Sequence, residues 1–344
     1  MSLGFFLEKE RKKMNTIANI TAVQRDRYEL NIGTDFFYGR LKKAAFYNSK
    51  EMKTFPTVGD RVEILRNPEG DNVILKVLER KSVFMRQNAT QGMPDQAVAA
   101  NFDYVFITLS LNRDFHMSKL ERYLSVAWKS GGTPVILLTK ADLLEDRKKI
   151  FMQIASLAPE VDVHCVSSLT GEGFSNLQKY FASGKTVVLL GSSGVGKSSL
   201  INLLMGTEQM LTGEIREADS QGRHTTTYKQ MFTIPETILL PNGQTIRGGG
   251  KIIDTPGMRK LIMGEEAEGI GITFEDIEEL ITQCRFTNCR HASEPGCAIR
   301  QALQDGTLDP RHFKTYLSLQ KEQSYSRERK QILIKKAGKA IKRG

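Results

Sequence analysis

One segment of the chain has the residue pattern of a loop that binds phosphate groups. Residues 191–198 read Gly-Ser-Ser-Gly-Val-Gly-Lys-Ser and match G-x-x-x-x-G-K-S/T at every fixed position. Glycines let the backbone wrap around phosphates and direct its N–H groups at them, at the start of a helix. We expect Lys197 to reach the β- and γ-phosphates and Ser198 to bind Mg²⁺. The other expected phosphate contacts are Gly191, Ser192, Ser193, Gly194, Val195, Gly196 and Ser199.

Two motifs upstream of this loop have the residues of a guanine site. Thr139-Lys140-Ala141-Asp142 ends an apolar run, and Asp142 can accept hydrogen bonds from the N1–H and exocyclic amine of guanine. Adenine lacks this pair of donors and would leave the carboxylate unpaired. The Lys140 stem can lie across the base, and the turn Ser167-Ser168-Leu169 can bring a backbone N–H to the guanine O6. Both motifs argue against the competing interpretation, an ATPase.

A third motif could complete a site for magnesium and the γ-phosphate. Asp254-Thr-Pro-Gly257 follows an apolar strand, so that Asp254 can hold Mg²⁺ through a water and the Gly257 N–H can meet the γ-phosphate. In many GTPases a glutamine follows this motif and orients the attacking water. Met258 stands at that position here and cannot do so. We therefore expect slow intrinsic hydrolysis.

A long polar segment, residues 206–232, has the character of a switch that only a γ-phosphate orders. Thr226 is the expected switch ligand of Mg²⁺, and Thr225 is the alternative. His224 is our candidate for orienting the attacking water, because an imidazole can accept a hydrogen bond from it. The competing interpretation of His224 is a surface histidine or an RNA contact.

These motifs need a parallel sheet to position them. Near-continuous apolar strands alternate with helical segments from residue 101 onwards, which predicts an α/β domain, placed at 97–262. The expected strands are Tyr104–Leu109, Pro134–Leu138, Val161–Val166, Thr186–Leu190 and Lys251–Ile253. Earlier in the chain, residues 15–86 hold short β segments separated by turns, which is typical of an OB-like barrel.

The order of the motifs is unusual for a GTPase. The base-reading motifs come first, and Asp142 precedes Gly191 by 49 residues. A circular permutation can produce this order without changing a parallel sheet. The strands keep their places, while the chain is opened at one loop and the original termini are joined. The expected join is a helix from Phe174 to Tyr180 followed by the turn Ser183-Gly184-Lys185. We infer a circularly permuted GTPase domain.

The C-terminal residues 263–344 are helical and polar and contain a cluster of metal ligands. Cys284, Cys289, His291 and Cys297 lie within fourteen residues, and three thiolates with one imidazole form a closed structural Zn²⁺ set. Clustered free thiols are the competing interpretation. Cys165 lies in an apolar strand and is expected to be a core residue.

The net charge and the composition limit the kinds of partner and the cellular location expected for this chain. The formal net charge of the 344 residues is +10, and residues 311–344 alone hold eleven Lys/Arg against two Glu. Such a tail indicates a polyanion, nucleic acid before anionic lipid, or else a solvated end that only aids solubility. The like charges of residues 326–344 argue against order in isolation. Four cysteines and no long apolar run favour a cytoplasmic protein over a secreted or membrane one.

The motif order, together with Gly222-Arg-His-Thr-Thr-Thr227, resembles the circularly permuted, ribosome-small-subunit-dependent GTPases of the RsgA/YjeQ family. The resemblance covers nearly the whole chain and implies an OB-like barrel, a permuted GTPase domain and a zinc-binding helical domain. Ser168 stands where that family usually has alanine.

The resemblance also implies a function. We expect a monomer that hydrolyses GTP slowly to GDP and phosphate, with Mg²⁺ and one structural Zn²⁺. It implies stimulation by the small (30S) ribosomal subunit during late maturation and binding to 16S rRNA. An RNA-binding assembly module with a structural nucleotide is the alternative.

Overall fold

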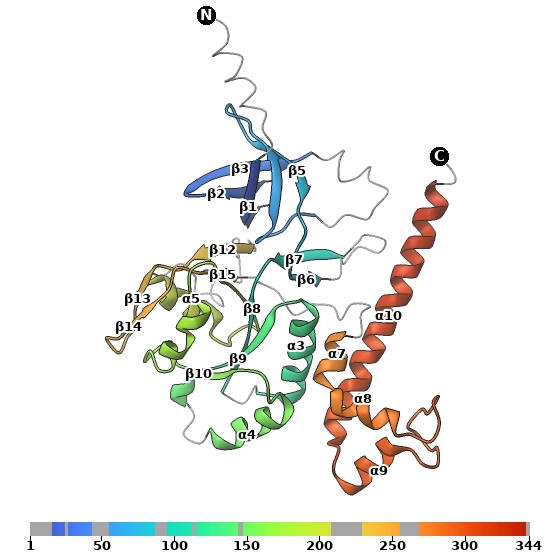
Figure 1. Cartoon of the computed structure of the whole chain (residues 1–344). Helices are drawn as coiled ribbons and strands as arrows, with labels where there is room; N and C mark the ends of the chain where they lie inside the picture. The colour runs from blue at the N-terminus through green and yellow to red at the C-terminus, as the bar shows by residue number, and fades with distance from the viewer. Residues whose placement is uncertain are drawn as a thin grey trace, which may run out of the picture.

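In the computed structural model, the described residues are 16–24, 27–42, 55–86, 95–111, 115–143, 147–207, 229–254 and 268–341. They form a barrel, a sheet covered by helices and a group of C-terminal helices, in that order along the chain (Figure 1). Within these ranges no helix is long and apolar enough to cross a membrane. This architecture confirms the expected fold class.

The N-terminal part is a closed barrel of five strands. The strands are β1 (Thr16–Val23), β2 (Tyr28–Ile32), β3 (Asp35–Leu41), β4 (Arg61–Leu65) and β5 (Asn72–Val77). Their order is β1-β2-β3-β5-β4, and β4 pairs with β1 again, which closes the ring. Strands β3 and β5 run parallel, and the other neighbours run antiparallel. The fully buried side chains of Ile20, Leu30 and Ile64 lie in its core, as an OB-like barrel requires.

A hairpin of β6 (Val83–Arg86) and β7 (Gln96–Ala100) follows the barrel. Arg80, just before this hairpin, forms an ion pair of 2.7 Å with the fully buried Asp60 of the barrel. Thr57 donates a hydrogen bond of 2.9 Å to the carbonyl oxygen of Val98 in β7. These contacts fix the barrel to the element that leads into the central sheet.

The central sheet has the strand order β10-β9-β8-β11-β15-β12 and continues into the barrel through β1. Its strands are β8 (Tyr104–Ser110), β9 (Thr133–Thr139), β10 (Val163–Val166), β11 (Thr186–Leu190), β12 (Lys229–Thr233) and β15 (Lys251–Asp254). All pairings from β10 to β15 are parallel, whereas β12 is antiparallel to β15. Strand β11 lies between strands that precede it and a strand that follows it, so the chain order reverses there. Ligands of open α/β sheets bind outside the carboxyl ends of the strands at such a reversal.

Alternating residues of the strands face two separate apolar layers. Val105 and Ile107 of β8 pack with Leu120 and Leu124 of helix α3 (Met117–Lys129), and Ile154 of α4 (Lys148–Leu157) belongs to the same layer. Phe106 between them belongs to the opposite layer. That layer also holds the 3-10 helix η2 (Phe174–Tyr180), helix α5 (Lys197–Met205) and the hairpin of β13 (Thr237–Leu239) and β14 (Thr245–Arg247).

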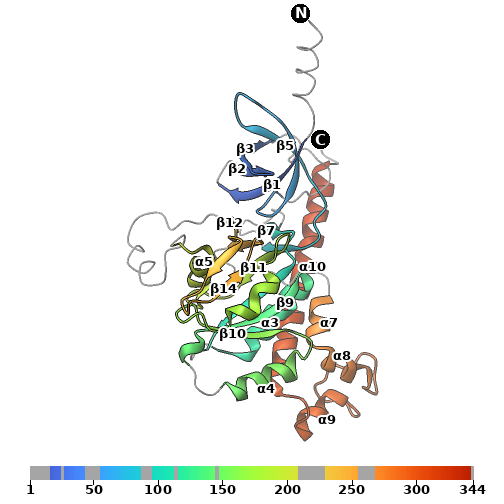
Figure 2. The same cartoon turned by 60° about the vertical axis from the view of Figure 1, so that its left-hand side comes forward.

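The C-terminal helices pack on the α3 side of the sheet (Figures 1 and 2). They are α7 (Glu268–Thr273), α8 (Glu275–Thr282), α9 (Ala298–Asp305) and the long α10 (Pro310–Ile341). Arg122 of α3 forms a two-bonded ion pair with Glu322 of α10, at 2.7 and 2.8 Å. Helix α10 continues through the basic residues that we did not expect to be ordered in isolation.

Candidate nucleotide site and metal cluster

The phosphate loop joins β11 to α5 at the point where the strand order reverses. Gly196 immediately precedes α5 and has a φ of +95°, which only glycine adopts easily. A Cβ at Gly191 would lie 2.5 Å from the carbonyl oxygen of Thr108, so that no side chain fits there. Both glycines are therefore required by this loop geometry, and Ser198 and Ser199 lie in the first turn of α5.

Side chains hold this loop in shape. The Lys197 Nζ donates hydrogen bonds to the carbonyl oxygens of Gly191 at 2.7 Å and Ser192 at 2.6 Å. Thr139, at the end of β9, donates to the carbonyl oxygen of Val195 at 2.6 Å. The lysine therefore lies across the loop, and the loop is tied to the strand that leads into the base-reading motif.

Asp254 lies at the same edge of the sheet as the loop. It ends β15, which is parallel to β11 with Ile253 opposite Val188. The Asp254 side chain is buried, with 6% of the residue exposed. The carboxyl ends of adjacent parallel strands meet at one edge, so the carboxylate and Ser198 are brought to the same side of the sheet. The sequence assigns these two residues to one magnesium ion.

The two base-reading motifs meet through a hydrogen bond. The fully buried Ser167 donates from its Oγ to Asp142 Oδ1 at 2.6 Å. The same Oγ accepts from the backbone N–H groups of Leu169 and Thr170, both at 3.3 Å. Lys140 has a left-handed backbone with φ of +57°, which turns the chain sharply between β9 and the 3-10 helix η1 (Ala141–Leu143). Asp142 is thereby oriented by the second motif.

An ion pair that the sequence analysis did not identify also joins these motifs. Arg147 Nη1 lies 2.6 Å from Glu172 Oε1, and Arg147 Nη2 donates to the carbonyl oxygen of Ala141 at 2.6 Å. The carbonyl oxygen of Glu172 in turn accepts from the Ser167 N–H at 3.1 Å. Arg147 therefore bridges the two segments, but its partners are six and 25 residues away and form no local motif.

A pocket of about 950 Å³ lies between these motifs and α5. Its walls include residues of the base-reading motifs, helix α5 and the end of β13: Thr139, Lys140, Asp142, Leu143, Ser168, Leu169, Gly196, Ser199, Asn202, Leu203, Gly206, Thr207, Leu239, Leu240 and Pro241. This size is within the range of small-molecule sites. The contribution of β13 was not expected from the sequence.

Four predicted residues lie outside the described part of the chain. They are His224, Thr225, Thr226 and Gly257, and Met258 is outside it as well. Their roles therefore stay predictions.

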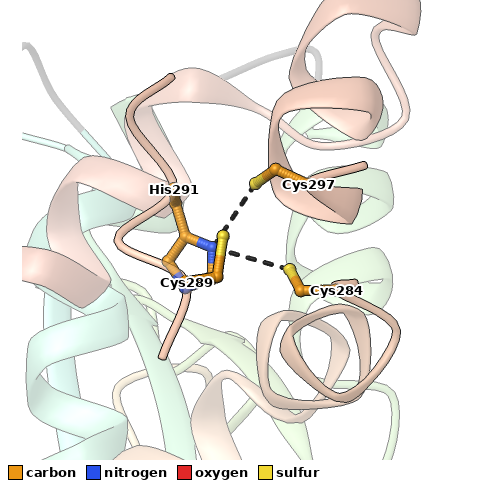
Figure 3. A group of neighbouring side chains, drawn as sticks. All are labelled: Cys284, Cys289, His291 and Cys297. Carbon is orange, nitrogen blue, oxygen red and sulfur yellow. Dashed lines mark hydrogen bonds between the residues drawn. The ribbon is translucent and has the colours of Figure 1, made fainter. Parts of the chain in front are cut away.

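The four predicted metal ligands come together between α8 and α9 (Figure 3). The ligand atoms of Cys284, Cys289, His291 and Cys297 all lie within 4.8 Å of one another. His291 Nδ1 is 3.6 Å from Cys284 Sγ and 3.5 Å from Cys297 Sγ. A tetrahedral zinc ion with ordinary bond lengths places such nitrogen and sulfur atoms about 3.6 Å apart. The set therefore fits Zn²⁺ in both chemistry and spacing.

Backbone N–H groups at the start of α9 support thiolates in this cluster. The Arg300 N–H donates to Cys297 Sγ at 3.5 Å. Desolvation alone would raise the pKa of Cys284, but hydrogen bonds from the backbone N–H groups of Ala298 and Ile299 and from Cys289 and Cys297 together lower the pKa, whereas desolvation raises the pKa of Cys289 to about 11. A thiolate is the form that binds a metal ion. Cys165, by contrast, lies half-buried in β10, away from this cluster.

A second polar cluster fixes α10 to the sheet domain. His312 of α10 lies 2.9 Å from Glu121 of α3 and 3.2 Å from Asp276 of α8. Burial alone would lower the pKa of His312, but hydrogen bonds to Asp276 and Glu121 outweigh it and raise the pKa to about 9. The imidazole is therefore charged at neutral pH and pairs with both carboxylates.

Sequence comparison identifies relatives of this chain. The family model described as RsgA GTPase matches residues 77–263. The chain is 46% identical over 322 residues to small ribosomal subunit biogenesis GTPase RsgA 2 of Listeria monocytogenes, which covers 94% of this chain and 88% of that protein. It is 39% identical to small ribosomal subunit biogenesis GTPase RsgA of Methanosarcina acetivorans, over 83% of this chain and 74% of that one.

Solved structures agree in fold. YjeQ from Thermotoga maritima aligns with a TM-score of 0.61 and 23% identity, over 90% of this chain and 99% of that chain. YloQ, which is described as a circularly permuted GTPase, aligns with a TM-score of 0.57 and 25% identity, over 91% of this chain and 96% of that chain. From the family match and the long, closely related sequences it follows that this chain is a GTPase of the RsgA family.

Proposed function

We propose that this chain binds GTP with Mg²⁺ at the carboxyl edge of its parallel sheet and hydrolyses it slowly, acting in maturation of the small ribosomal subunit. The observation that carries the proposal is that Gly196 of the phosphate loop and Asp142, which accepts a hydrogen bond from Ser167, line one pocket. The relatives are named small ribosomal subunit biogenesis GTPases, and these names support the proposal that this chain acts on the small ribosomal subunit. Stimulation by the 30S subunit late in maturation is part of this proposal.

The phosphate end of the proposed site uses three described side chains. Lys197, held against the loop carbonyls, reaches the β- and γ-phosphates. Ser198 binds Mg²⁺ directly, and the buried Asp254 holds it through a water. The bound ion would neutralise charge on the phosphate oxygens while these residues fix its position.

The switch residues complete the proposed site. Thr226, or Thr225 beside it, contributes the switch ligand of Mg²⁺, and the Gly257 N–H meets the γ-phosphate. His224 orients the attacking water in place of the glutamine that Met258 replaces. We propose that the ribosomal particle orders this region, which accounts for slow turnover without it.

At the other end of the site lie the groups that we propose recognise guanine. Asp142 accepts from the N1–H and the exocyclic amine, and its hydrogen bond from Ser167 fixes its orientation. A backbone N–H of the turn at Ser168 and Leu169 meets the guanine O6, and the stem of Lys140 covers one face of the base. Adenine offers Asp142 no such pair of donors.

We propose that the barrel and the C-terminal helices bind 16S rRNA. Strand β3 carries Phe36, which is 61% exposed, and Tyr38, over whose ring the Arg27 guanidinium lies at 3.9 Å. Exposed aromatics with arginines on this face are typical of OB-folds that stack on bases. On α10 the exposed Lys314 and Lys321 belong to the basic series of residues 311–344. One structural Zn²⁺ holds the fold of the C-terminal helices.

The working units of this proposal are the barrel at 15–86, the permuted GTPase domain at 97–262 and the zinc-binding domain at 263–344. We propose that the chain acts as a monomer and in the cytoplasm, where its ribosomal partner is assembled.

The test is GTP turnover with and without purified small subunits, with large subunits as the control particle. The expected result is slow release of phosphate alone, faster release with small subunits and no change with large ones. Lys197→Ala serves as the matched inactive control, because the proposal assigns its side chain to the β- and γ-phosphates. Turnover that small subunits leave unchanged would favour the alternative of an RNA-binding module with a structural nucleotide.

A further inference from the structure

The sheet domain contains a hairpin that folds back over the helices beside the nucleotide pocket. Strands β13 and β14 are inserted between the antiparallel neighbours β12 and β15 and lie beside α5 (Figure 1). Ile238 and Ile246 of the hairpin are buried in the same layer as Leu177 of η2 and Leu204 of α5. The Arg247 N–H donates to the Gln178 side chain at 3.2 Å. The hairpin is therefore fixed to the face of the sheet rather than free in solution.

The tip of this hairpin, residues 239–243, packs against the turn that reads the base. A Cβ at Gly171, just after that turn, would lie 3.1 Å from Pro241 Cδ and 3.3 Å from Leu240 Cβ. The tip is closed by hydrogen bonds from Leu240 N to Gln244 O at 2.8 Å and from Gly243 N to Leu240 O at 2.9 Å. A tight tip in direct contact with the turn can position it.

The tip also lines the pocket opposite polar groups of the base-reading motifs. Leu239, Leu240 and Pro241 share the 950 Å³ pocket with Lys140 and Asp142. Leu240 is 2% exposed and anchors the tip in the core, whereas Leu239 is 69% exposed. Nucleotide pockets of this kind have apolar walls and few polar groups that fix orientation.

Three exposed leucines surround this one pocket. Leu143 is 63% exposed and Leu169 is 76% exposed, in addition to Leu239 at 69%. They come from three segments that are far apart in sequence, so no single amphipathic element explains their exposure. A purine has apolar faces and polar edges. One purine can therefore donate hydrogen bonds to Asp142 from an edge and pack a face against the leucines.

We propose that the tip of the β13–β14 hairpin is a part of the guanine site, with Leu239 as the apolar wall against which the nucleoside half of GTP packs. The inference rests on the proposed GTP site. The wall contacts base and ribose and not the phosphates. Its loss should therefore weaken the binding of GDP and GTP equally.

The experiment is calorimetric titration of Leu239→Ser with unlabelled GDP and GTP. We expect both affinities to fall about tenfold, which corresponds to about 1.4 kcal/mol, as loss of one apolar contact implies. Leu239→Met, which keeps the apolar contact, should bind as the wild type does. Leu317→Ser is the matched control, because Leu317 is an exposed leucine of α10 outside the pocket.

Three outcomes distinguish the possibilities. Equal losses for GDP and GTP in Leu239→Ser, with Leu239→Met and Leu317→Ser unchanged, support the apolar wall. Affinities of Leu239→Ser within twofold of the wild type, or a loss for GTP alone, overturn it. If the wild type binds neither nucleotide, the proposed GTP site itself fails, which the same titration shows before any variant is measured.

Discussion

The ion pair between Arg147 and Glu172 should control how firmly the two base-reading segments are held together. Arg147 contacts Glu172 in one segment and the Ala141 carbonyl in the other, each at 2.6 Å. Because guanine needs both segments in place, free energy lost from their alignment should appear as weaker nucleotide binding. We expect Arg147→Ala and Glu172→Ala to raise the dissociation constants for GDP and GTP.

The contacts of the two side chains predict a larger loss of nucleotide affinity for Arg147→Ala than for Glu172→Ala. The Arg147 side chain is 28% exposed and that of Glu172 is 46% exposed, so solvent screens the pair to about 0.5–1 kcal/mol. Glu172→Ala removes only this pair and should weaken binding about two- to fivefold. Arg147→Ala also removes the bond to the Ala141 carbonyl, worth about 1 kcal/mol more, and should weaken binding about ten- to thirtyfold.

The assay is titration of both variants and of the double variant with GDP, alongside thermal unfolding. Lys179→Ala is the matched control, because Lys179 forms a comparable exposed ion pair with Asp162 in the same domain but does not contact the base-reading segments. The double variant should match Arg147→Ala, since the pair is already lost there. A larger effect from Glu172→Ala than from Arg147→Ala would refute the bridging argument.

Four further substitutions test the rest of the site. Asp142→Asn should shift preference from guanosine towards xanthosine nucleotides in competition titrations, since the amide donates where the carboxylate accepts; unchanged GTP affinity contradicts the base assignment. Lys197→Ala should abolish phosphate release with an unchanged circular dichroism spectrum, because its loop lies outside the core. Cys289→Ala should lose zinc in metal analysis while the sheet domain still binds GDP. The wild type should lose thermal stability as pH rises from 6.5 to about 9, because a histidine whose pKa is raised by folding stabilises the protein fully only below pH 6.5. His312→Gln should reduce this loss, and parallel stability curves for the two proteins would contradict the prediction.

The sequence predicted those parts of the fold that depend on local pattern. Buried parallel strands are continuous apolar runs, so β8, β9 and β11 were predicted to within a residue or two. Strand β3 was not singled out, because its aromatic residues Phe36 and Tyr38 face solvent and break the apolar alternation. The sequence predicted helical segments between these strands, and one of them is α4, which begins at Lys148. Periodicity alone does not locate that start.

The parts of the site that were not predicted depend on contacts between distant segments. The phosphate loop and the cysteine cluster are local in sequence, and their spacing carries their geometry. Arg147 acquires its role only when Glu172 is brought to it by the pairing of β9 with β10. The wall at Leu239 likewise exists because the hairpin folds back onto Gly171. Neither residue has a neighbour in sequence that marks it.

The circular permutation gives the C-terminal helices two connections to the nucleotide site. The strand that carries Asp254 is the last of the sheet, so the chain leaves the GTPase core there and enters α7. Those helices then pack back on α3 through His312 with Glu121 and through Arg122 with Glu322. Helix α3 follows β8, which is a neighbour of β11 and the phosphate loop. The C-terminal helices are therefore linked to the nucleotide site in two ways, by the chain that follows Asp254 and by the packing of α10 on α3.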